Sequence, residues 1–186
     1  MSETNSQYDR VIGNSREIFL KKTNDYGTAW RVLRNISIVD QIYIKAQRIR
    51  TIQEKKQQKI QDNIGDEFIG IINYAVIGMM QLKLGSNDPE ELPADRVAAL
   101  YEGQVQLTRE LMENKNHDYG EAWRSMSQES FVDLILMKLQ RIRQIISNEG
   151  RTLISEGIDA NYADILNYAV FALILMNEKA LPGSPD

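Results

Sequence analysis

The chain has 186 residues, of which 42% are hydrophobic and 26% are charged, and its formal net charge is -4 at pH 7. These values are ordinary for a globular protein, so they exclude collagen-like, disordered and disulfide-rich chains. With no cysteine and one histidine, a single copy cannot build a thiolate nucleophile, a cysteine zinc site or a multi-histidine metal cluster. Any bound metal would therefore be a hard cation held by oxygen ligands.

The distribution of charge and hydropathy limits the classes of partner that we expect this protein to bind. Residues 1–93 carry 13 Lys and Arg against 12 Asp and Glu, and residues 94–186 carry 9 against 14. Neither half offers the broad basic surface that binding to double-stranded nucleic acid requires. No apolar run reaches the ~18 residues needed to span a bilayer, and the polar start lacks the apolar core of a signal peptide. We therefore expect no double-stranded nucleic acid partner, no membrane contact and a cytoplasmic location.

Three sequence blocks occur twice in the same order, which indicates an internal duplication. The first is Asp-Tyr-Gly-x-Ala-Trp-Arg, with six of its seven residues identical between the copies. The second copy of the first two blocks lies 93 residues after the first copy, and one inserted residue precedes the third. The paired blocks are 25–31 and 118–124, 45–50 and 138–143, and 73–76 and 167–170.

The prolines and glycines divide the chain into two repeats. All four prolines lie outside the repeat interiors, where they would break helices. The division is 1–84 for repeat one, 85–93 for a Gly/Pro linker, 94–181 for repeat two and 182–186 for a tail. A unit of this size buries little surface alone. The two repeats are therefore expected to pack together as one domain.

Within each repeat the apolar residues follow a helical period. The first helix carries one stripe and should end at Gly27, or at Gly120 in repeat two, where a left-handed residue commonly closes a helix. A second helix is predicted from a Ser37 cap to about Lys56, and its counterpart covers about 129–148. The third helices are apolar on nearly every side and cover about 65–83 and 160–177. The predicted fold class is all-α, a helical bundle of six principal helices from two tandem pseudo-symmetric three-helix repeats.

Basic residues recur on the apolar stripe of the second helix. Lys45 lies in line with isoleucines, Arg48 follows one turn later, and Lys138 and Arg141 repeat the arrangement. Such a Lys-x-x-Arg edge can bind phosphate, with arginine as a planar fork and lysine as a point charge. The alternative is internal pairing with an acid, because a buried charge is usually paired whatever its role. The sequence leaves both interpretations open.

The third helix of each repeat begins with acids that could pair with those lysines or hold a metal. Repeat one has Asp62 and Asp66, and repeat two has Glu156 and Asp164, with Gly70 in repeat one opposite Asp164. Mg²⁺ prefers oxygen ligands and often binds through one or two carboxylates together with substrate phosphates. Asp66 and Asp164 are the predicted metal ligands and catalytic acids, whereas acids in a first turn also simply favour the helix dipole.

The repeated Asp-Tyr-Gly-x-Ala-Trp-Arg block lies at the corner between the first and second helices. Trp30 and Trp123 are most simply apolar anchors for this corner. Together with Tyr26 and Tyr119 they could instead stack on a base. In the functional interpretation the acids of the same block, Asp25 and Asp118, orient the loop or a water molecule.

These motifs resemble the nucleotide modification associated domain 1 family, first catalogued as a domain of unknown function. The resemblance covers most of the chain, and its name implies a role near free or modified nucleotides. It is carried in the two copies by Lys22, Asp25, Tyr26, Gly27, Ala29, Trp30, Lys45, Arg48, Asn73, Tyr74 and Ala75, and by Lys115, Asp118, Tyr119, Gly120, Trp123, Lys138, Arg141, Glu156, Asp164, Asn167 and Tyr168. More distantly, the acids before Asn-Tyr resemble the MazG-type all-α nucleoside triphosphate pyrophosphohydrolases. That family carries Glu-x-x-Glu where this chain has Lys45-x-x-Arg48 and Lys138-x-x-Arg141.

Two hypotheses follow. In the first, the protein binds a nucleotide or another phosphate-bearing small molecule, with Mg²⁺ as cofactor and a pyrophosphohydrolase-like reaction as one outcome. In the second, it is a non-catalytic helical interaction or structural module whose lysines and acids fix how the helices pack. A homo-oligomer is compatible with either hypothesis.

Overall fold

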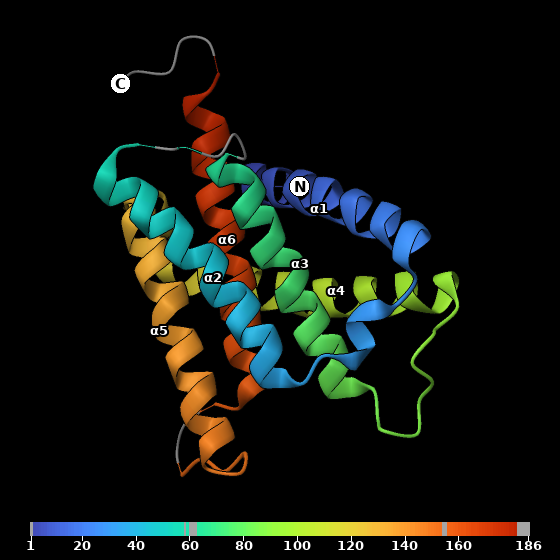
Figure 1. The fold of residues 1–186 in the computed structure, drawn as a ribbon. Helices are drawn as coiled ribbons and strands as arrows, with labels where there is room; N and C mark the ends of the chain where they lie inside the picture. The colour runs from blue at the N-terminus through green and yellow to red at the C-terminus, as the bar shows by residue number, and fades with distance from the viewer. Residues whose placement is uncertain (1, 58, 60–62, 154–155, 182–186) are drawn as a thin grey trace.

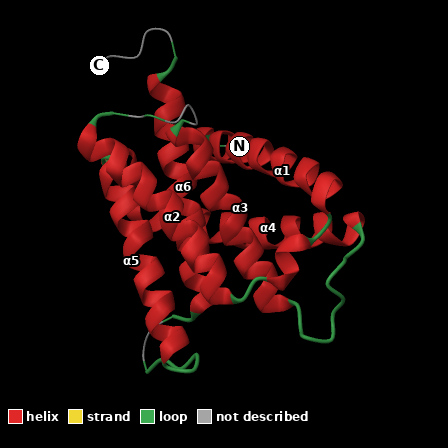
Figure 2. Ribbon diagram, viewed as in Figure 1, coloured by secondary structure: helices red, strands yellow, loops and turns green. Residues whose placement is uncertain are grey.

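The computed structural model is built from six α-helices and two short 3-10 helices, and it describes residues 2–57, 59, 63–153 and 156–181. No strand occurs in those ranges (Figure 2). The all-α prediction with three principal helices in each repeat is confirmed. The elements are α1 (Glu3–Tyr26), η1 (Ala29–Val32), α2 (Asn35–Lys55), α3 (Ile64–Lys83), α4 (Ala94–Tyr119), η2 (Ala122–Ser125), α5 (Gln128–Ser147) and α6 (Ile158–Lys179).

The helices form three layers of two. The middle layer is α3 with α6, one face of which is covered by α2 and α5 and the other by α1 and α4 (Figure 1). Each layer holds one helix from each repeat, so the two repeats share a core. Phe68 on α3, Tyr162 on α6 and Phe131 on α5 are among its fully buried side chains. The nearly all-round apolarity of the third helices thus reflects their central position.

By length and composition alone, α6 is long and apolar enough to cross a membrane. Most of that stretch is buried inside the protein, against α3 and α5. Its apolar character is therefore accounted for by packing within the bundle.

Capping side chains explain where several helices begin, but one predicted cap is wrong. Asn63 caps α3 by accepting a hydrogen bond from the Asp66 amide at 2.8 Å, and Ser127 caps α5. The prediction that Ser37 caps the second helix is wrong. The chain is extended at Arg34, so α2 begins at Asn35 and Ser37 lies within its first turn. Arg34 holds the position of Ser127 in the repeat alignment, and it makes no side-chain cap.

Both glycine corners have a positive φ, but only one of them is left-handed. Gly27 ends α1 with φ of 60° and ψ of -140°, and Gly120 ends α4 with φ of 60° and ψ of 35°, so the expectation of a left-handed residue holds for Gly120 alone. Each corner leads into a short 3-10 helix that carries the tryptophan of the repeated block. The predicted tail 182–186 and the acid Asp62 lie outside the described residues.

Buried polar pairs link the two repeats reciprocally. The hydroxyl of Tyr101 on α4 donates to Asn73 Oδ1 on α3 at 2.8 Å, and the hydroxyl of Tyr8 on α1 donates to Asn167 Oδ1 on α6 at 2.8 Å. The amide nitrogen of each asparagine donates to a carbonyl of the first helix of its own repeat. The repeated asparagine therefore joins its own repeat to the opposite one, and all its hydrogen bonds are made in the core.

Candidate functional site

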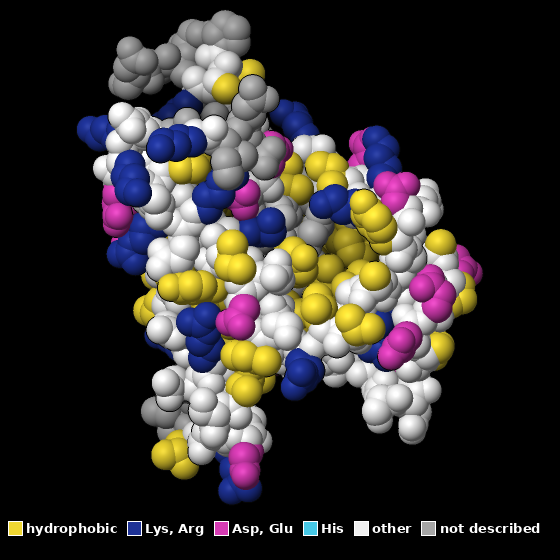
Figure 3. Space-filling model, in the orientation of Figure 1, with side chains coloured by type: hydrophobic (Ala, Val, Ile, Leu, Met, Phe, Trp, Pro, Cys, Tyr) yellow, Lys and Arg dark blue, Asp and Glu magenta, His cyan; other side chains and the backbone are white. Residues whose placement is uncertain are grey.

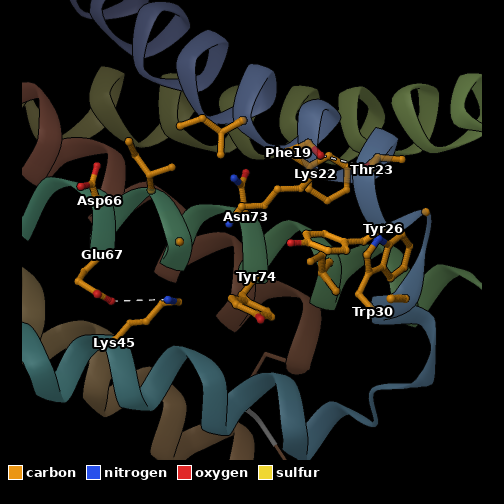
Figure 4. Close-up of a pocket in the computed structure, with 16 residues that line it drawn as sticks. Phe19, Lys22, Thr23, Tyr26, Trp30, Lys45, Asp66, Glu67, Asn73 and Tyr74 are labelled. Carbon is orange, nitrogen blue, oxygen red and sulfur yellow. Dashed lines mark hydrogen bonds and ion pairs between the residues drawn. The ribbon is translucent and has the colours of Figure 1, made fainter. Parts of the chain in front are cut away.

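A cavity of about 580 Å³ opens in repeat one between α1, η1, α2 and α3 (Figure 4). This volume lies within the range of small-molecule sites. In Figure 3 the surface is hollowed beside α1 and α3, with hydrophobic side chains inside the hollow and Lys or Arg side chains near its rim. The polar and aromatic side chains that line the cavity are Phe19, Lys22, Thr23, Tyr26, Trp30, Lys45, Asp66, Glu67, Asn73 and Tyr74.

Lys45 reaches the cavity from α2. Its Nζ lies 3.6 Å from Glu67 Oε2, and Arg48 lies 2.6 Å from the other oxygen of Glu67. A separation of 3.6 Å is longer than a hydrogen bond, so Glu67 serves mainly Arg48. The Lys45 ammonium also lies 5.9 Å from the centre of the Tyr74 ring. Lys45 therefore keeps hydrogen-bonding capacity toward the cavity.

Lys22 supplies a second ammonium group from α1. Figure 4 shows its side chain extending into the cavity toward α3, the helix that Lys45 also approaches. In the described part of the chain Lys22 has no ion-pair or hydrogen-bond partner. Lys22 and Lys45 thus border one cavity from two different helices. Lys22 is the one that is unpaired within the described residues.

The aromatic corner forms the other end of the cavity. Tyr26 is 73% exposed at the end of α1, and Trp30 is partly buried on η1. The indole nitrogen of Trp30 is itself buried, yet it finds no hydrogen-bond acceptor among the described residues. A buried N–H group without a partner is rare and costs free energy. Trp30 therefore lines the cavity with part of its side chain and keeps a buried, unsatisfied donor.

The same positions in repeat two are arranged differently. Asp164 lies at the position of Gly70, and its two oxygens bind Lys138 Nζ at 2.6 Å and Lys115 Nζ at 2.7 Å. Lys138 and Asp164 are both buried. Burial opposes the charge of Lys115, but the hydrogen bond to Asp164 and its charge outweigh that effect, so the pKa of Lys115 is raised. One carboxylate of repeat two thus binds both lysines.

The tryptophan of repeat two is fully partnered as well. The ring of Phe171 stacks on Trp123 with centroids 4.2 Å apart and planes at 7°. The indole nitrogen of Trp123 donates to Asn116 Oδ1 at 3.1 Å. Repeat one has Ile77 in place of Phe171 and Thr23 in place of Asn116. Repeat two therefore uses its own side chains to make contacts that repeat one leaves open.

The structure brings together only some of the residues that the sequence singled out. Tyr26, Trp30, Lys45 and Asp66 line one cavity, and Arg48 lies beside it through Glu67. Lys138 and Asp164 form an internal ion pair, as the structural interpretation expected for that repeat. Asp164 does not line the cavity, so the two predicted metal ligands contact different groups.

The remaining predicted residues lie apart from the cavity. Asp25 is exposed near the end of α1 without lining the cavity, Asp118 contacts the neighbouring histidine, and Tyr119 is 74% exposed. Arg141 borders a separate, shallow groove along α5. The described residues form no group of three or more acidic or histidine side chains placed to hold a metal ion.

Sequence reasoning did not assign roles to several residues that the structure makes important. Lys22 and Lys115 appeared only within the family resemblance, and Glu67 was not singled out. The repeat alignment holds the signal, since Lys22 and Lys115 are 93 residues apart and each lies one turn before the corner block. Treating every aligned polar pair as a candidate would have included both lysines.

A family model matches both repeats over the regions that contain the residues described above. The model of the nucleotide modification associated domain 1 family matches residues 22–82 and 115–176, which together make up more than half of the chain. Comparisons with curated proteins and with solved structures gave no match. The first matched region starts at Lys22 and contains the lysines, the aromatic corner and α3 up to Leu82. The chain therefore belongs to the nucleotide modification associated domain 1 family and carries one copy of the domain in each repeat.

Proposed function

We propose that the cavity of repeat one binds a nucleotide or a closely related small molecule that carries a phosphate group. The observation that supports this most is the ammonium of Lys22, which has no partner among the described residues and faces a cavity that Lys45 also enters. A phosphate group would satisfy both ammonium groups through charge-assisted hydrogen bonds. The family description, which refers to nucleotide modification, is consistent with such a ligand.

Asp66 is the proposed metal ligand of the cavity. It lies at the cavity wall, exposed and without an ion-pair partner among the described residues. One carboxylate together with ligand phosphates is a common way to hold Mg²⁺. Asp66 is therefore the residue through which Mg²⁺ would strengthen binding of a phosphate ligand.

A MazG-type hydrolysis is not part of the proposal. That chemistry places acids where α2 carries Lys45 and Arg48, and both of these residues face Glu67. We therefore restrict the proposed activity to binding, and the release of pyrophosphate is measured as a separate outcome.

The structural-module hypothesis keeps support in repeat two. There the buried Lys138 is bound to the buried Asp164, an arrangement that fixes the packing of α5 on α6. The two hypotheses thus divide between the halves of the chain, with a ligand site in repeat one and an internal ion pair in repeat two.

The test is calorimetric titration of the full chain with ribo- and deoxyribonucleotides, with and without Mg²⁺. We expect Lys22→Met to weaken nucleotide binding about 10- to 100-fold, the effect of losing a hydrogen bond to a charged group. Lys115→Met is the matched control, because it removes the aligned lysine while Lys138 still neutralises Asp164.

The expected result for that control is unchanged affinity. Equal binding by wild type and Lys22→Met, or no binding of any nucleotide at millimolar concentration, would overturn the proposal. Loss of the Mg²⁺ dependence in Asp66→Asn would identify the metal ligand.

A further inference from the structure

The second repeat contains contacts that indicate how a ligand would lie in the first. We propose, on the basis of the function proposed above, that repeat one takes one nucleotide with its phosphate group beside Gly70, between Lys22 and Lys45, and its base against Trp30. Repeat two makes both contacts with its own side chains, Asp164 and Phe171, and takes no ligand. The chain therefore binds one nucleotide, although it contains two copies of the domain.

The phosphate position follows from Asp164. Its carboxylate lies within 2.7 Å of two lysines that come from α4 and α5. The aligned lysines of repeat one come from α1 and α2, but the aligned acid is Gly70. A Cβ built on Gly70 would lie 2.8 Å from Lys45 Cε, 2.9 Å from its Cδ and 3.1 Å from its Nζ, so the Lys45 side chain itself lies against the glycine. The ammonium of Lys45 is thus already beside the glycine where repeat two places its anion.

The base position follows from Phe171. In repeat two an aromatic ring lies flat on Trp123, and Asn116 accepts the indole hydrogen bond. Trp30 lines the cavity but has neither a stacked ring nor an acceptor among the described residues. A nucleobase has a flat π face, so it can supply the missing ring contact to the part of Trp30 that lines the cavity.

The two positions require a ligand with two separated groups. Gly70 and Ile77 are seven residues apart on α3, about 10 Å along the helix axis. Neither inorganic phosphate nor a free base reaches both positions, whereas the sugar of a nucleotide connects a base to a phosphate over a gap. A nucleotide should therefore bind more tightly than either of its parts.

Four probes test this arrangement on the wild-type chain: a nucleoside 5′-monophosphate, the matching nucleoside, ribose 5-phosphate and inorganic phosphate. We expect one monophosphate bound per chain, with an affinity at least about tenfold above that of each other probe. Mass spectrometry of the native complex gives the stoichiometry independently of the calorimetric fit.

Two substitutions then transfer the repeat-two contacts into repeat one. Gly70→Asp adds the competing carboxylate and should abolish phosphate binding, whereas Gly70→Asn, which displaces Lys45 equally, should retain it within about threefold. Ile77→Phe adds the ring and should remove the advantage of the monophosphate over ribose 5-phosphate while leaving ribose 5-phosphate binding unchanged. Circular dichroism verifies that each variant is folded.

The outcomes separate this inference from the proposed function. If no phosphate compound binds the wild type, both fail. If a nucleotide binds but Gly70→Asp and Gly70→Asn bind it equally, or two nucleotides bind per chain, the proposed function stands and the inference fails. Should Gly70→Asp not fold, retention of the monophosphate advantage in Ile77→Phe would overturn the assigned base position.

Discussion

Asp164 and Gly70 account for much of the difference between the two repeats. The sequence shows that one position holds an acid in repeat two and a glycine in repeat one. It does not show that Lys115, three helices away, reaches the same acid, because that contact depends on how α4 packs against α6. Lys138 makes the internal pair that was one of its two possible roles from the sequence, whereas the Lys45 ammonium lies near Glu67 and also borders a cavity.

Removing the charge of Asp164 should strongly destabilise the protein. Asp164→Asn leaves the buried Lys138 without a counter-charge, and we expect the free energy of unfolding to fall by about 3 to 5 kcal/mol. Urea denaturation measures this change. Asp66→Asn is the control and should lower stability by less than about 1 kcal/mol, since Asp66 is exposed and unpaired among the described residues and only its favourable interaction with the start of α3 is lost. Similar effects of the two substitutions would contradict the structural role of Asp164.

At the scale of the helices, sequence periodicity predicts the order and approximate extent of all six elements. Periodicity also predicts that the third helices are central. It fails at the start of α2, because Arg34 is extended and the helix forms directly after the corner, ahead of the better capping residue Ser37. Whether two helices leave a cavity between them depends on the size of single residues such as Ile77 and Phe171, and no helical pattern encodes that.

The reciprocal hydrogen bonds between asparagine and tyrosine are expected to stabilise the packing of helices from opposite repeats. Tyr101→Phe removes the hydroxyl that Asn73 accepts from, and Tyr8→Phe does the same to Asn167. Each leaves a buried oxygen unsatisfied, and we expect each to lower the free energy of unfolding by about 1 to 3 kcal/mol.

Urea denaturation of Tyr101→Phe, of Asn73→Ala and of the double variant measures the energy of that pair, and Tyr8→Phe is measured beside them. Because Asn73 lines the cavity and Asn167 does not, only Tyr101→Phe should also weaken ligand binding. Full stability in either phenylalanine variant would exclude a joining role for that pair.

For the whole molecule, the buried tyrosines set an alkaline limit of stability. Burial raises the pKa values of Tyr8, Tyr101 and Tyr162 well above 10.0. In the unfolded chain these phenols ionise near pH 10, about their usual value, while the folded protein keeps them protonated. The free energy of unfolding is therefore unaffected by these groups below about pH 10 and falls above it.

Each such tyrosine steepens the fall by up to about 1.4 kcal/mol per pH unit. Lys115, with its raised pKa, adds to the loss in the same direction, because its stabilising contribution is complete below its unfolded pKa and disappears as the pH rises through the folded value. Urea unfolding across this range gives the slope, and Tyr162→Phe should reduce it. A stability that stays constant to about pH 11 would be inconsistent with buried phenols.

The shared core also predicts how the chain responds to cleavage. Arg31 donates to carbonyl oxygens of Gly85, Asp88 and Pro89, which holds the linker against repeat one. A protease site introduced at Asn87 should therefore yield two fragments that stay together in gel filtration, because α3 and α6 pack against each other. Residues 1–87 produced alone should lose helical circular dichroism. A stable, monomeric fragment would show that the repeats fold independently.

Asn73 also determines how far the effect of a bound nucleotide would extend. Its side chain lines the cavity, yet it is held by Tyr101 of the opposite repeat. Because the two repeats share this contact, unfolding of either repeat would disrupt the cavity and release the nucleotide. By mass action, a bound nucleotide therefore stabilises the entire folded chain. Amide hydrogen exchange should therefore slow in α5 and α6 by the same factor as in α1, although neither α5 nor α6 contributes a residue to the cavity wall.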